Sequence, residues 1–116
     1  MKAYTDVSQS KKLAEILPHT SADGTWEKVS ICGAKVDIPE DMQYRHKEIP
    51  FFIYSGIGVP CWSLVALLDI LPSSTLDSSN DHHYRLHCME RFSEWYDNPV
   101  DACVEMIIEL HEQKIL

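Results

Sequence analysis

One stretch near the C-terminus constrains the fold more than any other, because it carries a complete set of helix signals. Asn98 is a strong N-cap residue, and Pro99 suits the first helical position, where a backbone N–H would lack a partner anyway. Asp101 favours the positive end of the helix dipole. Apolar residues recur at spacings of three and four, namely Val100, Cys103, Val104, Ile107 and Leu110, while Glu105, Glu109, Glu112 and Gln113 face away. We expect a helix that starts after Asn98 and ends near His111 or Lys114.

Two further helices are each expected to end at a proline, which lacks the N–H that a helix needs to continue. Asp6 or Ser8 can cap the first of them, which ends before Pro18. The second is expected to open with Pro60 and to end before Pro72. The apolar residues that line one side are Leu13, Ile16 and Leu17 in the first helix, and Leu64, Leu67, Leu68 and Leu71 in the second.

Residues with high strand propensity fill most of the remaining chain. The expected strands are 26–31, 35–38, 51–54, 83–89 and 92–96. The first two are expected to form a hairpin, whereas the link Glu90-Arg91 between the last two lacks the Asn-Gly pair that tight hairpins favour. Two polar stretches without clear periodicity, Met42–Ile49 and Ser73–Asp81, are expected to be a loop and an exposed connection.

These elements predict an α+β fold, in which three helices pack against one antiparallel sheet of about four to five strands. The C-terminal helix should lie across the sheet, with the helix from Ser63 to Leu71 beside it. Because 116 residues fit one domain, we expect residues 1–116 to form a single α+β domain.

The charge of the chain argues against two classes of partner. The net charge is -8, and the ten Lys and Arg residues are scattered apart from the pair Lys11-Lys12. Proteins bind nucleic acids and anionic membranes through clustered cations, so we expect neither as a partner. The acidity is compatible with a basic protein partner. An exposed strand edge would also allow a twofold homodimer.

Other sequence features are typical of a cytoplasmic protein. No apolar run approaches the roughly 18 residues of a membrane helix. The residues Met1–Asp6 lack the apolar stretch of a secretion signal. The four cysteines, Cys32, Cys61, Cys88 and Cys103, form no CxxC pair, and we expect all of them to be small buried hydrophobic residues.

The dense group of metal-capable residues is His82, His83, His87 and Cys88. On a strand, His87 and Cys88 would face opposite sides, so they would not share an ion. On a helix, His83 and His87 would lie one turn apart and could bind the same ion. Because we expect a strand here, the sequence predicts no metal site.

The chain contains no GxGxxG, P-loop, GxSxG or HExxH motif. Cys61, beside Trp62 at an expected helix start, is the best candidate nucleophile, since a helix N-terminus lowers the pKa of a thiol. A buried Cys61 that anchors the helix entry is the competing interpretation. The three tryptophans are expected in the core, and an exposed one would mark a protein contact. We assign no catalytic, cofactor-binding or metal-ligating residue and expect no cofactor.

Three stretches resemble small uncharacterised proteins of gut Bacteroides and their phages or mobile elements. They are Tyr4–Asp6 with Gln9–Pro18 and Ser21–Asp23, Pro60–Leu64 with Leu71-Pro72, and Asp97–Ile108 with His111–Gln113. Together they cover a little under half of the chain. The resemblance implies a bacterial or phage origin, and it carries over no catalytic or binding residue.

Two functions follow as hypotheses. The first is a non-enzymatic accessory or interaction protein, possibly phage- or mobile-element-linked, because the chain is small and acidic and has no catalytic motif. The second is a small enzyme or ligand-binding domain with a cleft near Cys61 and Trp62.

Overall fold

The computed structural model describes residues 2–28, 44–48 and 58–116, and it confirms the α+β class. The α-helices are α1 (Val7–Ala14), α2 (Leu64–Ile70) and α3 (Pro99–Glu112), with a short 3-10 helix η1 (His19–Ser21). The strands are β1 (Gly24–Lys28), β2 (Tyr44–Glu48), β3 (Val59–Cys61), β4 (Ser74–Ser78), β5 (Tyr84–Cys88) and β6 (Arg91–Phe92).

The described strands form two antiparallel sheets rather than the one sheet expected, in the orders β2-β1-β3 and β4-β5-β6. The chain accordingly divides into two compact units. The N-terminal unit is Asp6–Trp62, and the C-terminal unit is Ser63–Leu116 together with Met1–Thr5. Each sheet has its own helix, because α1 packs on β3 and α3 packs on β5.

The C-terminal helix α3 confirms the prediction at both ends. The Asn98 side chain accepts a hydrogen bond of 2.9 Å from the backbone N–H of Asp101, and Pro99 occupies the first turn. The helix ends at Glu112, within the expected range. All five apolar residues predicted to face the core are buried.

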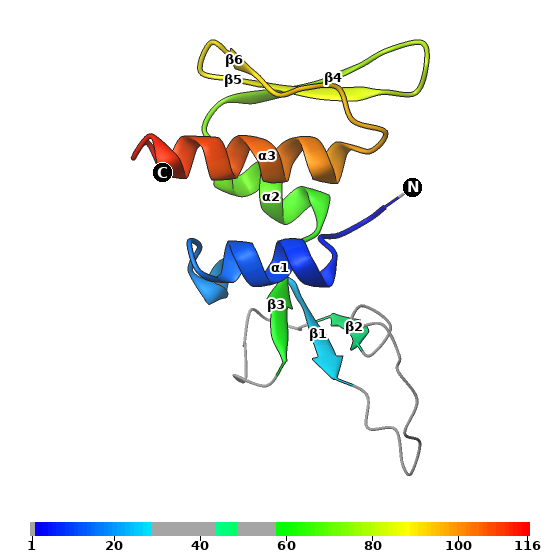
Figure 1. The fold of residues 1–116 in the computed structure, drawn as a ribbon, viewed down its shortest axis with the longest axis vertical. Coiled ribbons are helices and arrows are strands. Elements are labelled where there is room, and N and C mark those ends of the chain that lie inside the picture. Colours follow the sequence, from blue (N-terminus) through cyan, green and yellow to red (C-terminus); the bar gives the residue numbers. More distant parts are fainter. Residues whose placement is uncertain (1, 29–43, 49–57) are drawn as a thin grey trace. The chain divides into compact units, whose positions relative to one another are not determined.

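Two further α3 residues, Ala102 and Met106, are also fully buried. The reason is that α3 packs on two elements of its unit, with β5 on one side and α2 on the other (Figure 1). The sequence pattern anticipated one apolar face, whereas a central helix needs apolar residues over most of its circumference.

The second helix starts later than expected, because Ser63 rather than Pro60 begins it. The Ser63 hydroxyl accepts a hydrogen bond of 3.2 Å from the N–H of Ala66, which makes Ser63 the N-cap of α2. Pro60 instead lies in β3, opposite Thr25 of β1. A proline is tolerated there because β3 ends the order β2-β1-β3 and so has a side on which no N–H is needed.

Two strands lie where the polar sequence predicted loops. β4 lies within the expected connection Ser73–Asp81 and pairs with β5, which confirms the strand expected at His83–Met89. β2 lies within the expected loop Met42–Ile49 and pairs with β1. Both end their sheet orders, where polar or charged residues are typical because they discourage further strand pairing.

The first helix is capped by Asp6, which resolves the choice between Asp6 and Ser8. The Asp6 carboxylate accepts from the Gln9 backbone N–H at 2.8 Å, and the Gln9 side chain accepts from the Asp6 N–H at 3.1 Å. The helix ends at Ala14, before the expected Leu17. Pro18 disfavours helical backbone at Leu17, and the N–H groups of Ile16 and Leu17 both bond to the Leu13 carbonyl in a turn after the helix.

Other expected strands lie partly or wholly outside the described residues. β1 overlaps the strand expected at residues 26–31 up to Lys28. Residues 29–31, the strand at 35–38 with its hairpin, and the strand at 51–54 are not among the described residues.

The turn between β5 and β6 adopts an unusual backbone without glycine or asparagine. Cys88 pairs with Arg91, which leaves only Met89 and Glu90 in the loop. Their φ angles are 52° and 66°, as in the type I′ turn that Asn-Gly usually forms. β6 is shorter than the strand expected at residues 92–96, although Tyr96 still bridges to Tyr84.

We predict that Glu90→Gly raises the free energy of unfolding by about 0.5–1 kcal/mol, because glycine adopts positive φ without steric cost. Urea denaturation measures this change. Glu94→Gly is the matched control, since it removes the same charge at an exposed position and should lower stability slightly. A Glu90→Gly variant as destabilised as the control would contradict the strain at this turn.

Gly58, just before β3, lies at a second position where the backbone conformation favours glycine. Its φ is 87°, and a Cβ atom there would lie 2.5 Å from the carbonyl oxygen of Trp26 in β1. We predict that Gly58→Ala lowers the free energy of unfolding by at least about 2 kcal/mol, because backbone strain and the clash add. Thermal unfolding of the purified variant tests this, and an unchanged midpoint would show that β3 approaches β1 less closely.

Candidate functional site

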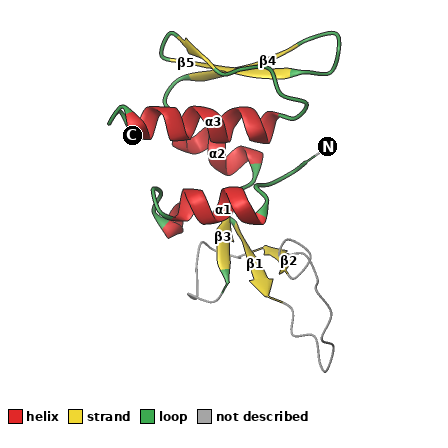
Figure 2. Ribbon diagram, in the orientation of Figure 1, coloured by secondary structure: helices red, strands yellow, loops and turns green. Residues whose placement is uncertain are grey.

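Strand β5 sorts its side chains onto two faces of its sheet. Leu86 and Cys88 are buried on the side that packs on α3. Because successive strand residues point to opposite faces, Arg85 and His87 lie on the other, outer side. The register brings Asp77 of β4 opposite Arg85, and Phe92 of β6 opposite His87. Figure 2 shows β4 and β5 covering one side of α3, with α2 on the other.

Four side chains on this outer side form a continuous stack. The rings of His87 and Phe92 are nearly parallel, with an interplanar angle of 6° and centroids 4.3 Å apart. The guanidinium carbon of Arg85 lies 4.3 Å from the centroid of Phe92 and 4.6 Å from that of Trp95. We call these four residues, Arg85, His87, Phe92 and Trp95, the aromatic face.

The rings at the aromatic face are unusually exposed for their size. Phe92 is 52% exposed and Trp95 is 45% exposed. The tryptophans were expected in the core, and Trp62 confirms this while Trp95 does not. Large exposed aromatic side chains that lie together are typical of a surface that contacts another molecule.

Arg85 is held mainly by stacking rather than by hydrogen bonds. Its guanidinium approaches the Asp77 carboxylate at 3.4 Å. Its Nε atom is buried without a hydrogen-bond partner among the described residues, which costs free energy unless other contacts offset it. The contacts with Phe92 and Trp95 supply that compensation, because a guanidinium is attracted to aromatic rings.

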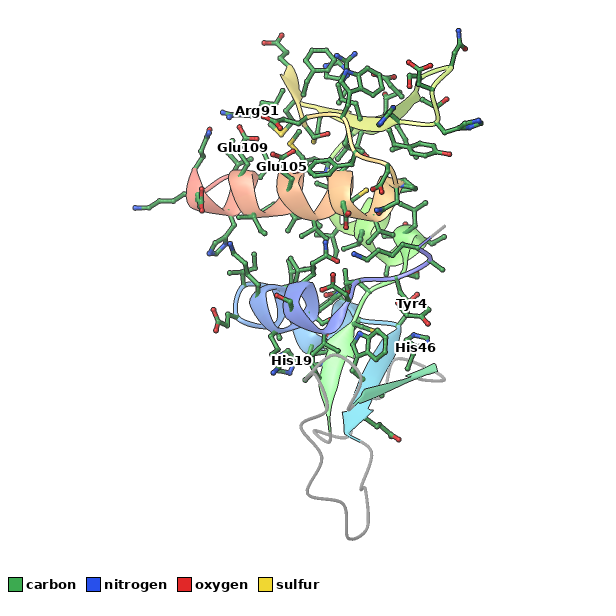
Figure 3. All side chains as sticks on the ribbon, turned by 45° about the vertical axis from the view of Figure 1, so that its right-hand side comes forward. Tyr4, His19, His46, Arg91, Glu105 and Glu109 are labelled. Carbon is green, nitrogen blue, oxygen red and sulfur yellow. The ribbon has the colours of Figure 1, made fainter. Side chains whose placement is uncertain are left out.

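The inner side of the same hairpin is tied to α3. Arg91 of β6 reaches Glu109 at 3.3 Å, and the Glu94 N–H donates to Glu105 at 3.0 Å. Figure 3 shows Arg91, Glu105 and Glu109 between the hairpin and α3. Burial, and then the charge and hydrogen bond of Glu105, raise the pKa of Tyr96. These contacts fix the backbone that presents the aromatic face.

Backbone bonds also hold the segment that carries Trp95. Ser93 donates from its N–H to the Leu86 carbonyl at 2.8 Å and accepts from the Leu86 N–H at its side-chain oxygen at 2.9 Å. Tyr96 exchanges two backbone hydrogen bonds with Tyr84, of 2.6 and 2.8 Å. The backbone is therefore held in place both before and after Trp95.

Three of the four cysteines are buried, as the sequence predicted. Cys61, Cys88 and Cys103 are buried and free, and Cys32 lies outside the described residues. Burial raises the pKa of the Cys103 thiol to about 12. Burial and the nearby Asp23 carboxylate raise the pKa of Cys61 to about 12 as well.

The structure thus confirms the expectation that Cys61 is buried, and it does not support Cys61 as a nucleophile activated by a helix start. Cys61 lies in β3 rather than at the start of α2, and its thiol stays protonated at neutral pH. A protonated thiol is a poor nucleophile. Its neighbour Trp62 is fully buried and donates from Nε1 to the Ser21 hydroxyl at 2.9 Å, which is a structural contact.

The histidines are spread over different environments. His82 and His83 are exposed before β5, whereas His87 stacks on Phe92 and Cys88 points to the opposite face. In the N-terminal unit, Trp26 packs edge-on against His46 with centroids 5.7 Å apart. Over residues 2–28, 44–48 and 58–116, no three His, Cys, Asp or Glu residues gather closely enough to hold a metal ion.

Comparisons of the chain with protein-family models, curated proteins and solved structures give no match. No helix in the described part of the chain is both long and apolar enough to cross a membrane.

We predict that alkaline pH destabilises the fold through the buried thiols. The ordinary thiol pKa is 9.0, so an unfolded thiol loses its proton above about pH 9, whereas folded Cys61 and Cys103 keep theirs up to about pH 12. The free energy of unfolding should be constant below this range and should fall within it by up to about 1.4 kcal/mol per pH unit for each thiol. Tyr96 adds a fall of the same sign above pH 10.

Urea denaturation at a series of pH values measures this slope. Cys103→Ala should reduce the slope while leaving the contribution of Cys61 in place. An identical slope in the parent and the variant would show that the Cys103 thiol does not carry the effect.

Proposed function

We propose that this protein is a non-enzymatic accessory or interaction protein that binds a protein partner through the aromatic face. The observation that carries the proposal is the half-exposed pair Phe92 and Trp95, stacked on Arg85 and His87. Aromatic residues and arginine are enriched at the centres of protein interfaces, where they contribute most of the binding energy.

The order already present at the aromatic face supports this function. A side chain that is free to rotate loses conformational entropy when a partner binds it, at a cost of about 0.5–1.5 kcal/mol. Phe92 lies between the pairing partner His87 and the Arg85 guanidinium, so it is largely ordered before binding. A partner would therefore meet a preformed surface.

The alternative function has less support from the same structure. Cys61 and Trp62 are both fully buried, and the pKa of Cys61 is raised. Phe92 and Trp95, by contrast, are accessible to a second molecule. The interaction protein is therefore the function that the described residues favour.

The cellular setting is part of the proposal and rests on the sequence. The three stretches beginning at Tyr4, Pro60 and Asp97 support a bacterial protein linked to a phage or mobile element. We propose the cytoplasm as its location, since the sequence has no apolar run of membrane-helix length. The net charge of -8 favours a basic protein over nucleic acid as the partner.

Site-specific photocrosslinking in bacterial cells tests the function. A benzophenone amino acid placed at Phe92 or Trp95 should give a discrete heavier product, because both positions would lie in the interface. The matched control carries the same reagent at Val65, which is 69% exposed on α2. Products that are equal at all three positions, or absent from positions 92 and 95, would contradict the proposal.

A further inference from the structure

Resting on the proposed function, we infer that the partner presents an arginine side chain within a basic segment. This arginine would stack on the part of the Trp95 ring that Arg85 leaves uncovered, and it would extend the stack of the aromatic face by one member. The inference adds the chemistry of the partner to the location of the site.

The order of the stack is the first support. The contacts run from His87 to Phe92, then to Arg85 and then to Trp95, so a guanidinium already lies between two aromatic rings. The stack ends at a tryptophan that is 45% exposed. Tryptophan is the aromatic side chain that attracts cations most strongly, so the free end of the stack suits a second guanidinium.

The charges around that free end are the second support. Glu94 and Asp97, on either side of Trp95 in the sequence, are exposed. An arginine on the ring would meet a segment that carries these two exposed carboxylates, and arginine pairs with carboxylates through two parallel hydrogen bonds. The cation on the face itself, Arg85, is already paired with Asp77.

The same charges disfavour other occupants of the face. A second copy of this chain would bring another net charge of -8, and like charges repel. An acidic segment or a nucleic acid would face the same repulsion. A basic segment of a different protein is the occupant that complements the surface.

Arginine is favoured over lysine on physical grounds. The guanidinium group is planar and weakly hydrated, so it stacks on a ring while its edge pairs with a carboxylate. The lysine ammonium is compact and strongly hydrated, and it cannot do both in one plane. The site should therefore discriminate between two residues of equal charge.

Titration of the 15N-labelled protein, residues 1–116, with synthetic peptides tests this inference. One Gly-Ser peptide carries spaced arginines, and two matched peptides carry lysine or the neutral isostere citrulline at the same positions. The indole N–H resonance of Trp95 should shift with the arginine peptide. We expect binding about fivefold weaker with lysine and no saturable shift with citrulline.

Variants connect the response to the stack. Trp95→Ala should abolish arginine-selective binding, and Trp95→Phe should retain part of it because a ring remains. Val65→Ala, at an exposed residue of α2, is the matched control and should bind as the parent does. The NMR spectrum of each variant shows directly whether it is folded.

Three outcomes would overturn the inference: equal affinity for the arginine and lysine peptides, arginine selectivity that survives Trp95→Ala, or no shift at Trp95. Each is distinguishable from failure of the proposed function. A crosslinked partner without arginine binding would overturn only the chemistry inferred for the partner. Absence of crosslinks from positions 92 and 95 would overturn the function itself.

Discussion

The burial of α3 from two directions is the constraint on which the C-terminal unit depends. β5 covers one side of the helix and α2 the other, so residues such as Ala102, Met106 and Ile107 are fully buried. Each large apolar side chain buried in this way contributes about 1.5–3 kcal/mol. Since Leu86 and Cys88 of β5 are buried in that core, strand alternation places Arg85 and His87 on the outer side of the sheet. The aromatic face is therefore a consequence of how α3 is packed.

The sequence predicts those elements best whose signals are complete within a few residues. The helix α3 has a cap at Asn98, a proline at its first turn and periodic apolar residues, and both of its ends were predicted. The start of the second helix was predicted wrongly because proline suits both a helix start and the end strand of a sheet. Pro60 lies in the strand, and Ser63 caps the helix. The strands β2 and β4 were missed because cross-strand pairing, rather than local propensity, stabilises polar strands of this kind.

The candidate site was only partly accessible from the sequence. The strand expected at His83–Met89 places His87 on the face opposite Cys88, and strand alternation puts Arg85 on the same face as His87. Placing Phe92 beside His87 required knowing that the loop contains only two residues, and Met89-Glu90 lacks the usual signature of such a loop. The exposure of Trp95 had no local signal, because it follows from tertiary packing.

The hairpin that carries the aromatic face combines several local features that are uncommon in folded proteins. Met89 and Glu90 have positive φ, as His82 and Lys114 of the same unit do. The Nε atom of Arg85 is buried without a hydrogen-bond partner among the described residues, and two large rings are half-exposed. Positive φ at two adjacent non-glycine residues lowers stability, whereas α2 and α3 in the same unit have side-chain N-caps. Local departures of this kind concentrate at functional sites, where selection acts on something other than stability. Their coincidence in one hairpin, and above all the positive φ of Met89 and Glu90, adds to the argument for binding that the aromatic and arginine side chains supply.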